Sequence, residues 1–505
     1  MENSKYDIII GLEIHVQSKT LSKMFCSCAT NYFEKEPNTH VCPTCLGLPG
    51  ALPVPNKRAI ELCILLGLAT QCDIDNEIHF DRKHYFYPDL PKGYQISQYK
   101  RPICSDGYID IKDEDGKKYT IGIERIHQEE DVAKSTHHTE SSTGQKYSLI
   151  DYNKSGVPLI EIVSKPNIRS AYQAKEYANR IRQIVRYLRI SDADMEKGQM
   201  RCEPNISIQE KGKWEYKDNG IAPIGDYKLN TKVEVKNIGS ISAVEKSIKY
   251  EIERIINTIE KGENIIQQTR GWNADKGITE FQRSKETADD YRYMPDPDIP
   301  IIEIAQKDIE RISKEIVELP NEKIERYQKE YDLSDYDCTV LTADREISNY
   351  FEDIVSLLTE GKDIQKAAKL ASNWVTGAVF SIANDKKIDI NEKNFPKEDL
   401  IELIKRFEDG TLTRNKAEEL LRRSIDKGNP LPKLIKNAIN EAQKSATNLG
   451  DIVNQVIKEN EKAVSDYKSG KQTTIGYLIG QVMQKTKGTA DPNEAKSVLI
   501  EKLNG

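Results

Sequence analysis

The chain has 505 residues and a net charge of −7, with 37% hydrophobic and 31% charged residues. This length is too great for one hydrophobic core, so we expect roughly two to four domains. No apolar run approaches the length needed to cross a bilayer, which argues against a membrane-spanning protein.

The charge is unevenly distributed along the chain. Residues 401–505 contain 18 Lys+Arg and 14 Asp+Glu, a net charge of +4, so the first 400 residues carry −11. Between Tyr467 and Ala490 there are four lysines and no acidic residue. A basic end on an acidic body predicts a tail that binds a polyanion and a body that binds something else, such as cations.

The N-terminus and the cysteine content bear on the compartment. The first residues, MENSKYD, have no basic segment leading into a signal-like apolar core, so we expect a cytoplasmic chain with no membrane partner. Nine cysteines, an odd number in a long chain, favour reduced thiols, some of them bound to metal, over a disulfide framework.

The first predicted element is a strand over residues 7–17, DIIIGLEIHVQ, where apolar and polar side chains alternate. The alternation predicts that Glu13, His15 and Gln17 share the face turned away from the core. A carboxylate beside an imidazole on a rigid strand can provide metal ligands or an acid/base pair. The alternative is a polar face that is merely solvated.

Two close cysteine pairs follow this strand. Cys26, Cys28, Cys42 and Cys45 have the spacing CxC, thirteen residues, CxxC. Each pair can supply adjacent thiolates and the loop can bring the pairs together, which predicts a closed, structural zinc site. Four unliganded thiols are the alternative.

Residues 81–98, DRKHYFYPDLPKGYQISQ, combine basic, aromatic and turn-forming residues. Arg82 and Lys83 can bind phosphate, and Tyr85 or Tyr87 can stack on a base. A solvated loop anchored by its tyrosines is the other interpretation.

Two further strand-like segments are acidic. Residues 121–131, IGIERIHQEED, end in Glu129, Glu130 and Asp131, and adjacent acids repel one another unless water or a cation screens them. In residues 157–163, VPLIEIV, apolar residues enclose Glu161, whose burial is costly without a partner or a metal ion. An edge strand with one wet face is the alternative for Glu161.

Two later segments add polar side chains in alternating positions. Residues 200–208, MRCEPNISI, place Arg201, Glu203 and Asn205 on one face, and residues 233–240, VEVKNIGS, place Glu234 and Lys236 together. Several carboxylates and a histidine from separate strands suit magnesium, which prefers oxygen ligands and commonly bridges to substrate phosphates.

The pattern changes along the chain from strands to helices. Up to about residue 300 we expect short strands and a few helices, such as one over residues 171–188. From about residue 301 helices dominate, and residues 394–398, NFPKE, are a plausible linker. The fold class is therefore α+β, with a β-rich N-terminal domain, an all-α domain and a small helical tail domain. One amphipathic helix is predicted from the spacing of Ile347, Tyr350, Phe351, Ile354, Leu357 and Leu358.

Common nucleotide-binding and hydrolase motifs are absent from the sequence. It contains no GxxxxGK[ST] phosphate loop, no GxGxxG after a strand, no GxSxG and no HExxH. If the chain uses ATP, its site must be built from strands.

Six segments together resemble one family: GLEIHVQ, CPTCLGLPGALPVPN, YFYPDLPKGYQISQ, HQEED, GVPLIEIVS and DYRYMPDPD. Their order and residues are similar to the B subunit of the glutamyl-tRNA(Gln)/aspartyl-tRNA(Asn) amidotransferase. The resemblance covers nearly the whole chain and includes the tail segment GYLIGQVMQKTKGTADP.

The resemblance implies three domains and a two-step reaction. It implies a cradle-like kinase domain with a four-cysteine zinc site over residues 1–300, a helical domain over 301–398 and a tRNA-binding helical tail over 399–505. The family uses ATP and magnesium to phosphorylate the side-chain carboxylate of glutamate mischarged on tRNA(Gln), or of aspartate on tRNA(Asn). Ammonia then displaces the phosphate, so the enzyme is a ligase that forms carbon–nitrogen bonds with glutamine as amido donor.

The resemblance also assigns site residues. The catalytic residues would be Glu13, His15, Glu130 and Glu161. The magnesium ligands would be these four together with Glu129 and Glu203, and the zinc ligands would be Cys26, Cys28, Cys42 and Cys45. Independently of the resemblance, the residue types in 81–98 predict that the nucleotide contacts Arg82, Lys83 and Tyr87. The lysine-rich tail segment predicts that the tRNA contacts Lys471, Lys485 and Lys487.

Ammonia must come from a partner, because the chain shows neither a Gly/Ser-rich amidase segment nor a cysteine glutaminase motif. The resemblance implies an amidase-type A subunit that supplies ammonia and a small C subunit wrapped around both. The alternative function is a non-catalytic tRNA-binding scaffold, in which the acidic strands are structural and a partner performs all chemistry.

Overall fold

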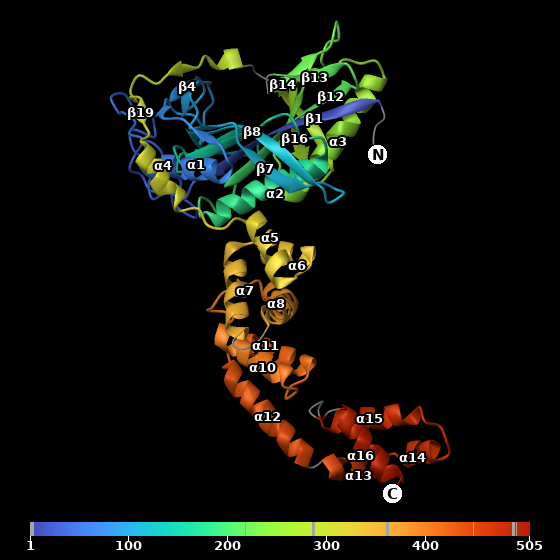
Figure 1. The fold of residues 1–505 in the computed structure, drawn as a ribbon. Helices are drawn as coiled ribbons and strands as arrows, with labels where there is room; N and C mark the ends of the chain where they lie inside the picture. The colour runs from blue at the N-terminus through green and yellow to red at the C-terminus, as the bar shows by residue number, and fades with distance from the viewer. Residues whose placement is uncertain are drawn as a thin grey trace. The chain divides into compact units, whose positions relative to one another are not determined.

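The computed structural model describes residues 5–217, 219–284, 288–359, 363–447, 449–486, 490 and 492–504. The chain divides into two compact units, Met1–Pro320 and Asn321–Gly505. A large sheet dominates the first unit and helices form the second (Figure 1), which confirms the predicted α+β class.

Ten strands form the main sheet of the first unit, in the order β17-β16-β15-β12-β1-β11-β8-β6-β2, with β7 paired to β8. Its central strand is the predicted N-terminal strand, which pairs antiparallel with strands on both sides. The strands are β1 Tyr6–Gln17, β2 Asp73–Ile74, β6 Cys104–Ser105, β7 Tyr108–Lys112, β8 Lys118–Glu130, β11 Pro158–Ser164, β12 Met200–Glu210, β15 Val233–Lys236, β16 Gln268–Asn273 and β17 Ile278–Ser284.

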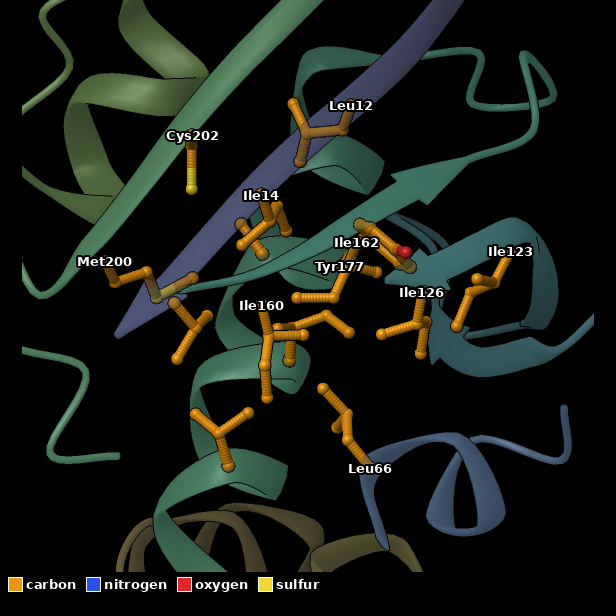
Figure 2. Packing of buried hydrophobic residues seen from close by; sticks show 14 of the residues in the cluster. Leu12, Ile14, Leu66, Ile123, Ile126, Ile160, Ile162, Tyr177, Met200 and Cys202 are labelled. Atoms are coloured by element: carbon orange, nitrogen blue, oxygen red, sulfur yellow. The ribbon is translucent and has the colours of Figure 1, made fainter. Parts of the chain in front are cut away.

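Helices cover one face of this sheet. α1 (Lys57–Ala69), α2 (Ala171–Tyr187) and α3 (Ile241–Glu260) contact β8, β1 and β12 respectively. Figure 2 shows Ile14, Ile160 and Ile126 from three neighbouring strands in one apolar layer with Tyr177 of α2 and Leu66 of α1. These five side chains are fully buried, so the alternation of apolar residues in the strands decides which face is covered. The other face is left for polar side chains.

Smaller sheets complete the first unit. β4 (Asp81–His84) pairs with β5 (Tyr94–Ser97) and β18 (Met294–Pro295). Short two-stranded pairs are formed by β3 (Glu77–Ile78) with β19 (Ile302–Glu303), β9 (Lys134–Thr139) with β10 (Lys146–Asp151), and β13 (Trp214–Lys217) with β14 (Gly220–Pro223).

The first unit extends beyond the boundary expected at residue 300. α4 (Gln306–Ser313) packs on α1, and Ile309 and Ile312 join the hydrophobic core of the main sheet. Arg58 of α1 also forms an ion pair with Glu315 at 2.9 Å. Residues up to about 320 therefore belong to this unit, because they pack on α1 and on the hydrophobic core of the main sheet.

The second unit contains two hydrophobic clusters. The first holds buried side chains from Tyr327 to Ala438 and the second from Leu449 to Leu503. The helices of the first are α5 Pro320–Tyr331, α6 Asp335–Leu341, α7 Arg345–Leu358, α8 Ile364–Asn373, the π-helix η2 Trp374–Val379, α9 Phe380–Lys386, α10 Lys397–Glu408, α11 Arg414–Lys427 and α12 Leu431–Thr447. Those of the second are α13 Leu449–Glu459, α14 Glu461–Lys468, α15 Thr474–Lys485 and α16 Pro492–Asn504.

Two local predictions have different outcomes in this unit. The amphipathic helix is present as α7, with Tyr350, Phe351 and Ile354 buried. The segment 394–398 is not a free linker, because Phe395 is 1% exposed and α10 packs on α7. Helices α10 to α12 thus belong to the first cluster, so the two clusters divide between their buried residues Ala438 and Leu449 and not at residue 398. Within the described residues, no helix is both long and apolar enough to cross a membrane.

Candidate active site and metal centres

The polar face of the main sheet forms the wall of a cavity of about 940 Å³. Strand alternation turns Glu13 and His15 of β1, Glu161 of β11 and Arg201 of β12 to this face. Register then brings them together, because His15 lies opposite Glu161 on one side and opposite Arg201 on the other. The cavity is therefore a direct product of the alternating pattern seen in the sequence.

The first acidic group consists of His15, Glu129 and Glu161. The Nε2 atom of His15 lies 3.7 Å from Oε1 of Glu129 and 3.5 Å from Oε2 of Glu161. One ligand atom from each of the three side chains lies within 4.8 Å of the others, so the three can hold a metal ion. Both carboxylates are almost completely buried, which requires a compensating charge.

A protonated His15 would supply that charge. Burial alone would lower the pKa of His15, but the nearby carboxylates of Glu161, Glu203 and Glu129 raise it to about 9. Burial alone would raise the pKa of Glu161, but His127 and His15 hold it well below its usual range. Burial and the charge of Glu161 raise the pKa of Glu129. A metal ion among these groups would replace the imidazolium as partner of both carboxylates.

His127 is a site residue that the sequence reasoning missed. Its Nε2 atom lies 3.3 Å from Oε2 of Glu161, and the side chain is 2% exposed. Its Nδ1 atom finds no hydrogen-bond partner among the described residues. The sequence contains the pattern that identifies it: His127 stands two residues before Glu129 on β8, and alternate residues of a strand share a face.

The second acidic group consists of Glu13, Glu203 and Glu234, whose carboxylate oxygens also lie within 4.8 Å of one another. The structure thus divides the predicted magnesium ligands, since Glu13 and Glu203 join Glu234 and not His15. Lys236 lies beside this group, with Nζ 2.6 Å from Oε2 of Glu203. The positive charge of Lys236 helps to lower the pKa of Glu203 to about 2 against the opposing effect of burial.

Glu130 does not reach either group. It follows Glu129 on β8, so its side chain points to the opposite face. There it pairs with Lys92 and accepts a hydrogen bond of 3.0 Å from the backbone N–H of Ile96. The prediction that Glu130 lies with His15 and Glu161 is therefore corrected by the structure, which places Glu129 in that position.

The predicted nucleotide-contacting residues are also divided. Lys83 and Tyr87 line the cavity, where Nζ of Lys83 lies 4.8 Å from the ring centre of Tyr291. Arg82 points away from it and forms ion pairs of 2.8 Å with Asp296 and Asp298. Adjacent residues of β4 face opposite sides, so Lys83 and Arg82 cannot both contact one ligand in the cavity.

The four predicted zinc ligands lie together. The sulfurs of Cys26, Cys28, Cys42 and Cys45 are all within 4.8 Å of one another. Tetrahedral zinc with bonds of about 2.3 Å needs sulfurs about 3.8 Å apart, so the four thiols fit this ion after a small adjustment. A hydrogen bond from Cys26 lowers the pKa of Cys45 to about 4, and a thiolate is the form that binds zinc.

Two of the predicted tRNA-contacting lysines, Lys471 and Lys485, lie in the part of the second unit that holds the second hydrophobic cluster. Lys471 is paired with Asp466 at 3.2 Å, and Lys485 is paired with Glu459 at 2.9 Å. Lys487 lies outside the described residues.

The sheet-walled cavity, its two acidic groups and its cationic and aromatic lining are typical of an enzyme whose polar site is built from strands. Residues 8–310 match the family model described as "GatB/GatE catalytic domain", and residues 349–503 match the "GatB domain" model. The chain therefore belongs to the family of B subunits of the aspartyl/glutamyl-tRNA(Asn/Gln) amidotransferase. This confirms the predicted family and its enzyme class, a ligase-type amidotransferase component.

Full-length relatives support the assignment. The B subunit of the aspartyl/glutamyl-tRNA(Asn/Gln) amidotransferase from Thermotoga sp. (strain RQ2) is 41% identical over 502 residues, covering 99% of this chain and 100% of the relative. A protein with the same description from Thermodesulfovibrio yellowstonii is 41% identical and covers 99% of both chains. Another from Rippkaea orientalis is 42% identical and covers 99% of this chain and 98% of its own.

Proposed function

We propose that the cavity of the first unit activates the side-chain carboxylate of an aminoacyl-tRNA by phosphorylation with ATP, before amidation by ammonia. The observation that carries the proposal is the first acidic group, His15, Glu129 and Glu161, gathered on the wall of a cavity of about 940 Å³. The substrate would be glutamate mischarged on tRNA(Gln) or aspartate on tRNA(Asn), giving Gln-tRNA(Gln) or Asn-tRNA(Asn).

The chemistry requires activation because a carboxylate is a poor electrophile. An acyl phosphate replaces the oxide by a good leaving group, and phosphoryl transfer depends mainly on positioning and on neutralising charge. A magnesium ion held by His15, Glu129 and Glu161 would supply the neutralising charge. His127 would orient Glu161 from the side.

Cationic and aromatic side chains that also line the cavity suit the nucleotide. Lys83 lies over the ring of Tyr291, and Arg283 lies 5.6 Å from the ring centre of Tyr87. Ammonium and guanidinium groups can pair with phosphate oxygens, and a tyrosine ring can stack on a base. The proposal thus keeps Lys83 and Tyr87 as nucleotide contacts and leaves Arg82 in its ion pairs.

Partner proteins would complete the reaction. An amidase-type A subunit would release ammonia from glutamine, and a small C subunit would join the complex. Enclosure of the ammonia would also protect the acyl phosphate from water. The lysines of the segment that holds the second hydrophobic cluster, Leu449 to Leu503, would bind the phosphates of the tRNA.

The proposal is tested in the complete complex with its glutaminase nucleophile disabled and ammonium supplied. With ATP and Glu-tRNA(Gln), we expect phosphate release and Gln-tRNA(Gln) formation at equal rates. If the chain were only a tRNA-binding scaffold, changing His15, Glu129 or Glu161 would leave both rates unaltered. Unaltered rates would therefore contradict the proposal. The same assay with Asp-tRNA(Asn) shows which mischarged tRNA is used.

We also propose that the four clustered cysteines hold a structural zinc ion. Changing Cys42 to Ser is expected to remove the zinc and to lower the thermal unfolding midpoint of the first unit by several degrees, because metal binding contributes directly to folding free energy. Elemental analysis and calorimetry measure the two effects. The matched control, Cys338→Ala in the second unit, should retain the zinc; full zinc content in Cys42→Ser would refute the site.

A further inference from the structure

The second acidic group contains its own positive charge. The ammonium of Lys236 lies 2.6 Å from Oε2 of Glu203 and 3.9 Å from Oε1 of Glu234. The side chain of Lys236 is 30% exposed, whereas those of Glu203 and Glu234 are 15% and 7% exposed. The lysine therefore reaches two poorly solvated carboxylates and stands where a cation between them would stand.

Neutral donors from neighbouring strands also contact this group. The side-chain amide of Asn205 donates to Oε1 of Glu13 at 2.9 Å, and the hydroxyl of Thr269 donates to Oε2 of Glu234 at 2.7 Å. Each of the three carboxylates thus accepts a hydrogen bond from this chain, and a metal ion would have to displace some of these donors or share their oxygens.

The two acidic groups differ in the basic side chain that lies among their carboxylates. In the first group the nitrogen belongs to His15, and a neutral imidazole is a common metal ligand. In the second group it belongs to Lys236, and an ammonium has three donors and no lone pair for a metal. A divalent cation among Glu13, Glu203 and Glu234 would also be repelled by this ammonium at short range.

We infer that Lys236 takes the place of a second divalent cation, so that the cavity binds one divalent ion, at the first acidic group. Lys236 is then a positioning residue that holds Glu203 and Glu234 in place beside the substrate. The inference rests on the proposed function, because it assumes that His15, Glu129 and Glu161 hold the first ion.

The number of bound ions tests the inference. The zinc-loaded, full-length chain in complex with its partner subunits is titrated with Mn²⁺, and tightly bound ions are counted by electron paramagnetic resonance. We expect one ion in the unaltered chain, one in Lys236→Arg, and two in Lys236→Met, where three carboxylates lose their internal countercharge. Two ions in the unaltered chain, or one in Lys236→Met, would overturn the inference.

A second variant keeps the test decisive if Lys236→Met does not fold. His15→Ala in the otherwise unaltered chain is expected to remove the single tight ion, whereas a remaining tight ion would show that the second group binds metal and would overturn the inference. An unaltered chain with no tight ion would instead refute the metal site of the proposed function. The failures of the two claims are therefore distinguishable.

Discussion

Changing Glu161 to Gln is expected to lower the rate of tRNA amidation by about 100-fold or more, while the affinity for tRNA stays nearly the same. Glu161 lies between His15 and His127 and is buried. Gln keeps the shape but removes the charge, and under the proposed function this loss of a metal-binding carboxylate forfeits several kcal/mol of transition-state stabilisation. Each 1.36 kcal/mol, roughly, corresponds to a tenfold change in rate. Phosphate release triggered by Glu-tRNA(Gln) is the measurement.

The matched control is Glu124→Gln, which neutralises an exposed carboxylate on neighbouring strand β8. It should leave phosphate release and amidation unchanged. An unaltered rate in Glu161→Gln would mean that this carboxylate takes no part in the chemistry.

Removal of residues 449–505 is expected to weaken tRNA binding about tenfold or more and to make its salt dependence shallower. This segment contains the four lysines between Tyr467 and Ala490. Each lysine that contacts a phosphate adds about one to the salt slope, so their removal reduces the slope accordingly. Filter binding of tRNA at several salt concentrations measures both effects.

The cut at residue 449 follows from the structure. A cut at residue 399 would remove Leu400, Leu403 and Ile404, which are buried in the first cluster of the second unit, and would therefore destabilise it. The matched control, Lys307→Gln on the exposed part of α4, should bind tRNA with the affinity of the unaltered chain. Equal affinity in the truncated chain would remove the tail from tRNA recognition.

The fold class was accessible from the sequence because periodicity is a local signal. The strand over residues 7–17 and the helices α2 and α7 follow directly from spacing of two and of three to four residues. The limits of the packed units were not accessible, since they depend on contacts between distant segments. Pro396 suggested a linker, but Phe395 fills a core position that only the tertiary structure defines.

Site residues could be predicted where the alternation along one strand alone decides which face of the sheet a side chain lies on. Glu13, His15 and Glu161 lie on the cavity face as their strands predict. The prediction named both members of two adjacent pairs, Glu129 with Glu130 and Arg82 with Lys83. Only Glu129 and Lys83 line the cavity, because adjacent residues of a strand face opposite sides.

The division of the acids into two groups required cross-strand register, which a single sequence does not reveal. His15 is opposite Glu161, whereas Glu13 is opposite Glu203, one row further along the sheet. The pairing of Asn205 with Glu234 then brings β15 and Lys236 to the second group. Strand order and register, and not the acids themselves, therefore decide which side chains lie together in each acidic group.

The central claim is that strands distant in sequence build one metal-dependent site on the polar face of the sheet. Anomalous diffraction from crystals of the complex grown with Mn²⁺ and a non-hydrolysable ATP analogue tests it most directly. We predict a manganese peak among the Nε2 atom of His15 and the carboxylates of Glu129 and Glu161, with the triphosphate of the analogue beside it. A nucleotide bound outside this cavity, with no manganese at these three side chains, would contradict the account.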